Sequence, residues 1–355
     1  MTRYRLGFLS LAAIVFLLLP KGSMAQDPAF TSTFDRGRCT FSTTGSNPYL
    51  PLWPGYSLLL EGEVEDAGET IDVAAKITVL PETELVDGVL TRVVEERESE
   101  DGEVVEVSRN FMALCRETGD VWYFSEDVDD YEDGVIVGHG GAWRAGVAGA
   151  KPGILMLGTP VLGARYFQEI APGVAEDRGE VTGLGEEVEV PAGIFDQTVT
   201  IVDTSALSAG AGDEKIYAHG VGLIKDEDLE LVEITPPPCQ PDATTHCLNG
   251  GRFRVTADWE GSSGSSGHGR AILPSDDGGG FSFFAPSNPE ILVKVLNGCS
   301  VPGFNSYWVF AGGLTNVGVT LTVEDTESGE ERVYRNPLGA AFAPVLDTSA
   351  FAECP

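Results

Sequence analysis

Residues 85–107 read LVDGVLTRVVEERESEDGEVVEV, and this stretch decides the fold class. It contains the pairs Asp87-Gly88 and Asp101-Gly102, and a third pair follows at Asp133-Gly134. Asp-Gly supplies the positive φ angles of a tight hairpin turn. Runs of alternating apolar and polar residues flank each pair, as in half-buried antiparallel strands. The stretch therefore predicts consecutive β-hairpins.

The same pattern of strand candidates extends over residues 47–234, with no sustained helical period. Within it, Ala145 to Thr159 is rich in Gly and Ala and is expected to be a crossing loop. Gly220 to Lys225 is expected to be the closing strand, with a further strand candidate at Asp226 to Leu231. A sheet of this size must curl or close to protect its edges. We therefore expect an all-β protein whose first domain is a curved antiparallel sheet, either a barrel or a half-barrel.

The chain outside residues 47–234 and the first 25 residues divides into an N-terminal segment, a linker and a second domain. Residues 26–46 are polar and are expected to be irregular. Residues 235–241 read TPPPCQP, and stacked prolines favour a stiff extended linker. Residues 242–355 contain short strand candidates separated by turn residues, which is typical of a β-sandwich. We expect this smaller sandwich to form a second domain.

Residues 1–25 have the features of an export signal. Arg3 and Arg5 precede an apolar run, and Ser23-Met24-Ala25 places small residues at the positions that signal peptidase prefers. The run is too short for a comfortable membrane span, and no later stretch reaches the necessary length. We expect a mature chain that starts near Gln26 and is secreted or periplasmic, with no membrane span.

The chain is strongly acidic, with 55 Asp and Glu against 22 Lys and Arg and a net charge of −33. Residues 26–235 carry 42 acidic and 13 basic side chains, whereas residues 236–355 carry 13 and 6. Such charge repels nucleic acid and anionic lipid, so neither is an expected partner. Solubility is the simplest explanation of the charge, and diffuse binding of divalent cations is the alternative.

Six cysteines in an exported chain predict disulfides rather than metal ligands, because no C-x-x-C spacing occurs. Cys39 and Cys115 are the two in the first domain and are expected to pair. The other four permit three connectivities, among which we favour the pairs Cys239–Cys247 and Cys299–Cys354.

Several short motifs carry a family resemblance. In the first domain they are Tyr49-Leu50-Pro51-Leu52, Val86-Asp87-Gly88-Val89, Val190 to Phe195 and Gly220 to Lys225. This domain resembles uncharacterised secreted bacterial β domains and, more coarsely, the half-barrels of lipoprotein-carrier proteins. The segment Cys247 to Val255, together with Tyr307 to Phe310, is similar to a domain often appended to secreted bacterial proteins. The resemblance implies fold and export, and it carries no activity.

Two groups of residues are candidate sites. The densest acidic cluster could ligate Ca²⁺, a cation that favours several oxygens, although the EF-hand pattern fails there and a solvated hairpin is the simpler interpretation. Aromatic residues of the first domain could line an apolar ligand cavity, although core packing would also explain them. The Ca²⁺ candidates are Asp127, Asp129, Asp130 and Asp133, and the ligand candidates are Trp53, Tyr56, Trp122 and Tyr166.

The sequence contains no catalytic motif, since no G-x-S-x-G and no H-E-x-x-H occurs. We expect a secreted, non-enzymatic protein that binds an apolar ligand or an extracellular partner through its first domain. Ca²⁺ is the only cofactor candidate. The alternatives are a hydrolase of an extracellular polymer, acting through an undetected carboxylate pair, and an adhesive component of a surface matrix.

Overall fold

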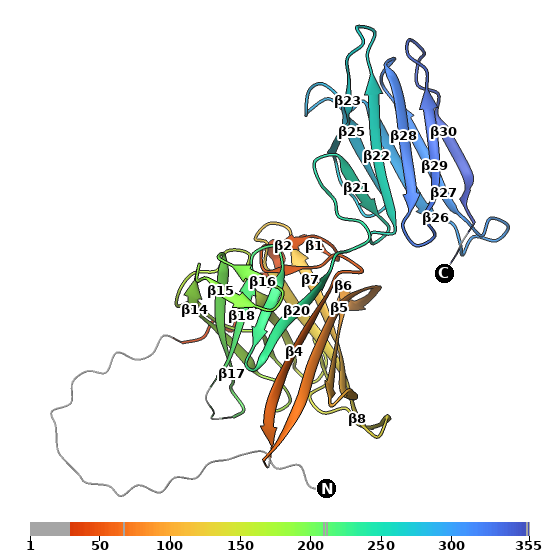
Figure 1. Cartoon of the computed structure of the whole chain (residues 1–355). Coiled ribbons are helices and arrows are strands. Elements are labelled where there is room, and N and C mark those ends of the chain that lie inside the picture. The colour runs from red at the N-terminus through yellow and green to blue at the C-terminus, as the bar shows by residue number, and fades with distance from the viewer. Residues whose placement is uncertain (1–28, 67, 209, 211, 353, 355) are drawn as a thin grey trace, which may run out of the picture.

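A computed structural model describes residues 29–352 and 354, without residues 67, 209 and 211. The expected export signal lies outside the described residues. The described chain is nearly all β, and its only helical element is a 3₁₀ turn at Arg36–Arg38. Figure 1 shows two β bodies, one formed by strands up to β20 and the other by strands from β21 onward. The all-β prediction is confirmed.

Long hairpins form one side of the first body. The strands are β4 (Ser57–Asp66), β5 (Glu69–Val86), β6 (Val89–Glu100), β7 (Glu103–Cys115) and β8 (Val121–Glu132), each antiparallel to the next. Asp87, Asp101 and Asp133 have φ angles of 46°, 48° and 50°, and the glycine after each is also positive. The Asp-Gly prediction is therefore confirmed, because these turns need two consecutive left-handed residues.

The first body is a single sixteen-stranded sheet that nearly closes on itself (Figure 1). Beyond β4 the sheet continues through β20 (Leu229–Thr235), β19 (Gly222–Asp226), β18 (Asp213–Ala218), β17 (Thr198–Ser205), β14 (Asp177–Leu184) and β12 (Arg165–Phe167). Beyond β8 it continues through β11 (Lys151–Met156) and β13 (Glu169–Ile170). The two ends, β12 and β13, are separated by one residue in the chain, so the sheet wraps around a common interior.

Two local expectations were wrong. The Gly- and Ala-rich segment is not wholly a loop, because β11 pairs with β8 and β13. A Cβ atom at Gly153 would lie 2.4 Å from the carbonyl oxygen of Phe167, so glycine here permits a close approach of backbones. The strand that pairs with β4 also differs from the expectation. Gly220 to Lys225, which contains β19, was expected to close the sheet, but β20 pairs with β4 and β19 pairs with β20.

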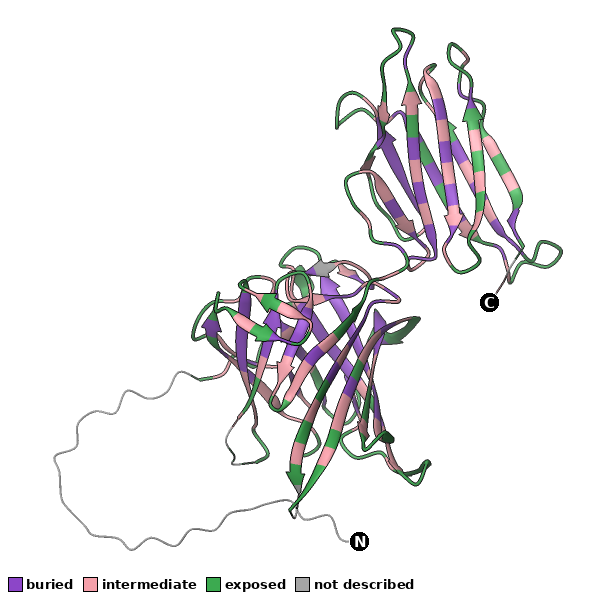
Figure 2. Cartoon of the chain, in the orientation of Figure 1, coloured by how far each residue is buried: buried purple, intermediate pink, exposed green. Residues whose placement is uncertain are grey.

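The second body consists of two five-stranded sheets. One contains β21 (Thr245–Leu248), β22 (Phe253–Glu260), β23 (Ser266–His268), β28 (Gly318–Asp325) and β29 (Glu330–Asn336). The other contains β24 (Arg270–Ile272), β25 (Gly278–Ser282), β26 (Ile291–Asn297), β27 (Tyr307–Gly313) and β30 (Val345–Phe351). Apolar side chains from both sheets form one hydrophobic cluster, and the burial along β28 alternates (Figure 2). This arrangement is a sandwich of two packed sheets.

The remaining strands of the first body are short. Three of them complete the sixteen-stranded sheet by pairing with β7 or β8, and they are β1 (Phe41–Ser42), β9 (Val135–Gly138) and β10 (Trp143–Arg144). The other four form two separate hairpins, β2 (Ser46–Asn47) with β3 (Leu50–Pro51) and β15 (Val188–Val190) with β16 (Gly193–Phe195).

All six cysteines are paired as the sequence favoured, in Cys39–Cys115, Cys239–Cys247 and Cys299–Cys354. Three disulfides indicate that the protein folds in an oxidising, extracellular type of environment. Among the described residues, no helix has the length and apolar character needed to cross a membrane.

Candidate functional site

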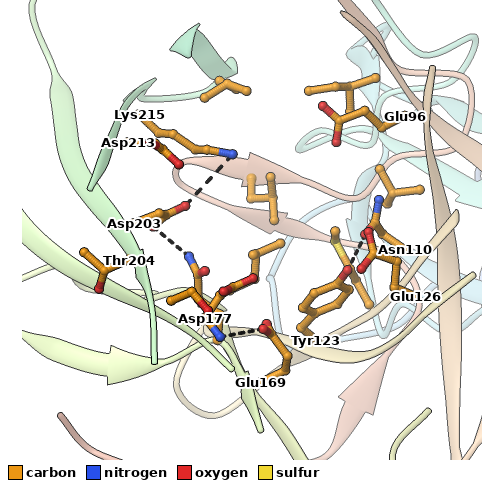
Figure 3. A pocket seen from close by; sticks show the side chains of 18 of the residues that line it. Glu96, Asn110, Tyr123, Glu126, Glu169, Asp177, Asp203, Thr204, Asp213 and Lys215 are labelled. Carbon is orange, nitrogen blue, oxygen red and sulfur yellow. Dashed lines mark hydrogen bonds and ion pairs between the residues drawn. The ribbon is translucent and has the colours of Figure 1, made fainter. Parts of the chain in front are cut away.

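The interior of the curved sheet contains a cavity of about 360 Å³, partly open to solvent (Figure 3). This volume lies in the range of small-molecule sites in proteins. Strands from both halves of the sheet contribute to its wall, and the loop between β17 and β18 adds Ser208 and Gly210. The cavity therefore exists only because the two ends of the sheet come round to face each other.

One part of the wall is acidic. Its six carboxyl groups come from β6, β8, β13, β14, β17 and β18, and they are Glu96, Glu126, Glu169, Asp177, Asp203 and Asp213. Strand alternation explains how they gather. On β18, Asp213, Lys215 and Tyr217 are two residues apart and all line the cavity, as do Val94 and Glu96 on β6.

The other part of the wall is apolar and is built from aliphatic side chains. They are Leu50, Ile77, Val94, Met112, Leu155 and Leu223. The lining is thus amphiphilic, with a charged region and a hydrocarbon region. A wholly apolar molecule would leave the carboxyl groups without a polar partner, and this would oppose its binding.

Hydrogen bonds hold several polar groups in place. The hydroxyl of Tyr123 donates to Oδ1 of Asn110 at 2.5 Å, and the backbone N–H of Asp177 donates to Oε1 of Glu169 at 2.7 Å (Figure 3). Nε2 of Gln168 donates to Oδ1 of Asp203 at 3.0 Å. These contacts orient polar groups of the wall, Glu169 and Asp203 among them, before any ligand binds, which favours binding.

The one basic residue among the described lining residues is Lys215. Its Nζ lies 3.1 Å from Oδ2 of Asp226 and 4.0 Å from Oδ2 of Asp203. Burial opposes the ammonium charge, but Tyr217 and these two carboxylates outweigh it and raise the pKa of Lys215. The side chain therefore stays charged and is already occupied by partners of its own.

Burial raises the pKa of several cavity carboxyl groups toward neutrality. The pKa is about 7 for Glu96 and for Glu126, about 8 for Glu169, where Asp177 adds repulsion, and about 6 for Asp203. Glu169 is 2% exposed, whereas Glu96 and Glu126 keep some accessible surface because they face the cavity. Near pH 7, the cavity therefore holds carboxyl groups that exchange protons readily.

The aromatic ligand candidates lie elsewhere. Trp122 packs edge-on against Phe34 and Phe41 in the core. The remaining three do not line this cavity either: the Tyr56 hydroxyl donates to the Val221 carbonyl at 2.7 Å, Tyr166 is 3% exposed, and Trp53 lines a separate cavity of about 490 Å³. The aromatic residues of the interior cavity are Tyr123 and Tyr217.

The Ca²⁺ candidates lie on and after β8 at its hairpin with β9. Asp129 is 3.0 Å from Nδ1 of His139, and Oδ2 of Asp130 accepts the N–H of Gly140 at 3.1 Å. Asp127 is exposed, and Asp133 forms the turn. In the described part of the chain, no group of three or more Asp, Glu, His or Cys side chains is arranged to hold a metal ion. A Ca²⁺ site here stays a prediction.

Comparison of the chain with protein-family models, with curated proteins and with solved structures returned no match. The resemblance to lipoprotein-carrier half-barrels therefore stays a prediction. A function can be inferred only from the cavity, its charges and its shape.

Proposed function

We propose that the protein is a secreted binding protein that holds a small molecule inside its curved first sheet. The cavity of about 360 Å³ carries this proposal, since it is enclosed by the sheet and lined by oriented polar groups. The three disulfides support a location outside the cytoplasm. The mixed lining favours a ligand with polar and apolar parts over the wholly apolar ligand that the sequence suggested.

Binding is better supported than hydrolysis of a polymer. A cavity of this volume suits a compact molecule, whereas a polymer-cleaving site needs a cleft that admits a chain. Raised carboxyl pKa values occur in glycosidases, but they also arise wherever acids are buried together.

Native mass spectrometry of the mature protein and a thermal-shift screen against a small-molecule collection would test the proposal. We expect a bound mass or stabilising compounds, because a ligand that binds only the folded state raises its stability. Substituting Leu155, which lines the cavity, by Trp should abolish both signals. The matched control is Leu346→Trp on the sandwich, where the side chain is 73% exposed.

Two outcomes would refute the binding function. One is a complete absence of bound mass and of stabilising compounds. The other is ligand binding that Leu155→Trp leaves unchanged, which would place the ligand outside the cavity.

A further inference from the structure

We propose that the ligand is a small organic ammonium ion, with its charged nitrogen among the cavity carboxyl groups and a hydrocarbon body against the aliphatic wall. This inference rests on the proposed binding function and names the chemical class of the ligand. Three features of the described cavity support it: an excess of acid over base, a tyrosine hydroxyl in the wall that makes no hydrogen bond to a described residue, and the apolar part of the wall.

The first feature is charge. Six carboxyl groups line the cavity against one ammonium, that of Lys215. This ammonium already lies between Asp203 and Asp226, the second of which is not part of the lining. A cavity walled on most sides by protein screens charge less than bulk water does, so its negative potential favours a cation.

The second feature is the hydroxyl of Tyr217, a neutral polar group that lies near the charges of Lys215 and Asp203. Its side chain lines the cavity and is 8% exposed, yet its hydroxyl makes no hydrogen bond to any residue that the structure describes. A buried tyrosine hydroxyl usually has a hydrogen-bond partner. The neighbouring hydroxyl, that of Tyr123, has one in Asn110. The Tyr217 oxygen is near the Lys215 ammonium, makes no hydrogen bond to a described residue, and has lone pairs that can accept an N–H from a bound ammonium.

The third feature distinguishes an organic cation from a metal ion. A bare or hydrated metal ion gains nothing from aliphatic side chains, whereas an alkyl or aryl body gains by being removed from water. Val94 and Met112 lie on the same strands as Glu96 and Asn110, two residues away in each case, so polar and apolar groups face one space. An amine with a hydrocarbon body matches both parts of the lining.

Such a ligand should displace protons. A cation beside a carboxyl group stabilises its ionised form, so binding should tighten as the pH rises from 6 to 8. The groups that face the site from the surrounding strands are the six carboxyl groups named above, Lys215, Tyr123 and Tyr217, with Glu98, Glu106 and Asp226 close behind them. Only carboxyl groups among them titrate in this range.

Three probes with the same body and different heads test the inference on the full mature chain. They are hexylamine, hexanol and hexanoate, measured by isothermal titration calorimetry in two buffers of different ionisation enthalpy. We expect hexylamine to bind at least tenfold more tightly than hexanol, with proton release, and hexanoate to show no binding. Affinity for hexylamine should rise as the pH is raised from 6 to 8.

Variants locate the site. Tyr217→Phe and Glu169→Gln should each weaken hexylamine binding about tenfold, because each removes a polar contact to a charged ligand. Tyr131→Phe and Glu214→Gln are the matched controls and should bind normally, since neither residue lines the cavity. Near-ultraviolet circular dichroism of each variant checks that the fold is kept, and a folded Tyr217→Phe with normal affinity would overturn the inference.

The outcomes separate this inference from the binding function. If hexanol or hexanoate binds as tightly as hexylamine, or if the small-molecule screen finds only neutral or anionic ligands, the ammonium class is wrong while the binding function stands. If the screen, the native mass spectra and all three probes show nothing, both fail.

Discussion

The two β bodies bury the apolar faces of their sheets in different ways. In the sandwich, two sheets lie face to face, and fully buried apolar residues such as Val255, Val309 and Leu321 fill the gap. In the first body, one sheet curls around its own interior, and its inward positions include carboxyl groups as well as aliphatic side chains. Facing sheets pack densely, whereas a curled sheet of this size can leave space in its middle.

The same contrast holds for buried charge. In the sandwich, the guanidinium of Arg252 forms a two-point contact with Asp325, with distances of 3.0 Å and 2.7 Å, and Asp325 is 0% exposed. In the cavity, six acids are present with one lysine, whose ammonium lies 4.0 Å from one of them, Asp203. A fully paired buried charge indicates a structural role, whereas an excess of one sign in a cavity indicates a site for a ligand. Variants in both bodies can test this distinction.

The largest expected effect concerns the disulfides. Replacing both Cys39 and Cys115 by Ser should lower the free energy of unfolding by roughly 4 kcal/mol, because this bridge spans 76 residues, whereas loss of Cys239–Cys247, which spans 8, should cost roughly 2.5 kcal/mol. Denaturant unfolding of the two double variants measures the difference. Equal losses would show that loop length does not set the stabilisation in the two bodies.

The next effect concerns the paired charge in the sandwich. Asp325→Asn should destabilise the protein by about 3 kcal/mol, because it leaves the buried Arg252 without its main counter-charge although Glu327 lies 3.2 Å away. Chemical denaturation measures the loss. Asp258→Asn, at an exposed contact with His268, is the control and should cost less than about 1 kcal/mol. A similar cost for both would argue against a structural role for the buried pair.

Dense packing of the sandwich can be tested at two glycines. A Cβ atom at Gly279 would lie 2.6 Å from the ring of His246, whereas one at Gly312 would meet nothing within 4 Å. Neither position has a left-handed φ angle. Gly279→Ala should therefore cost about 2 kcal/mol through overpacking, and Gly312→Ala should be neutral or nearly so. Thermal unfolding compares the two variants. Equal melting temperatures would mean that the sandwich interior is loosely packed and has room for the added methyl group.

The last effect concerns a buried acid of the cavity, Glu169, whose Oε1 accepts the backbone N–H of Asp177. The pKa of Glu169 is about 8 in the folded protein, above its usual value, so the folded state keeps a proton that the unfolded state loses. Stability from this group is present below about pH 4.5 and is lost as the pH rises through 8. Glu169→Gln should therefore stabilise the protein at about pH 7.5 and should flatten the fall in stability between about pH 5 and 8.

Melting curves of the ligand-free protein across this range measure the effect. Glu214→Gln, on the outward side of β18, is the control and should leave the slope unchanged. A steeper fall for Glu169→Gln than for the natural protein would mean that burial of this carboxyl group does not favour its protonated form.

Much of the first body was predictable because its signals are local. The turn at Asp101-Gly102 needs only its own φ angles, and the strands beside it follow from alternation. Strand β11 was missed because the Gly and Ala content of its segment indicated a loop. Gly153 is needed there because the backbone of another strand lies very close to it, and a local sequence pattern does not show such a contact. Strand β30 is also hard to predict from the sequence, since its residues are mostly polar or exposed and offer little alternation.

The cavity was not predictable in the same way. The spacing of Asp213, Lys215 and Tyr217 places them on one face of a strand, but both faces of that strand carry charged residues, so the pattern does not say which face points inward. The aromatic candidates were chosen as apolar cavity walls, and Trp122 and Tyr166 instead pack into the core, where large rings bury the most surface.

The sequence by itself determined the hairpins and the acidic character, because turn angles and charge are properties of short segments, and it favoured the cysteine pairing without excluding the other connectivities of the last four cysteines. Only the tertiary structure decided that the sheet nearly closes, which face of each strand lies inside, and that acids from six strands meet around one space. The physical reason is that alternation gives every strand two faces, and only the curvature of the whole sheet decides which face points inward.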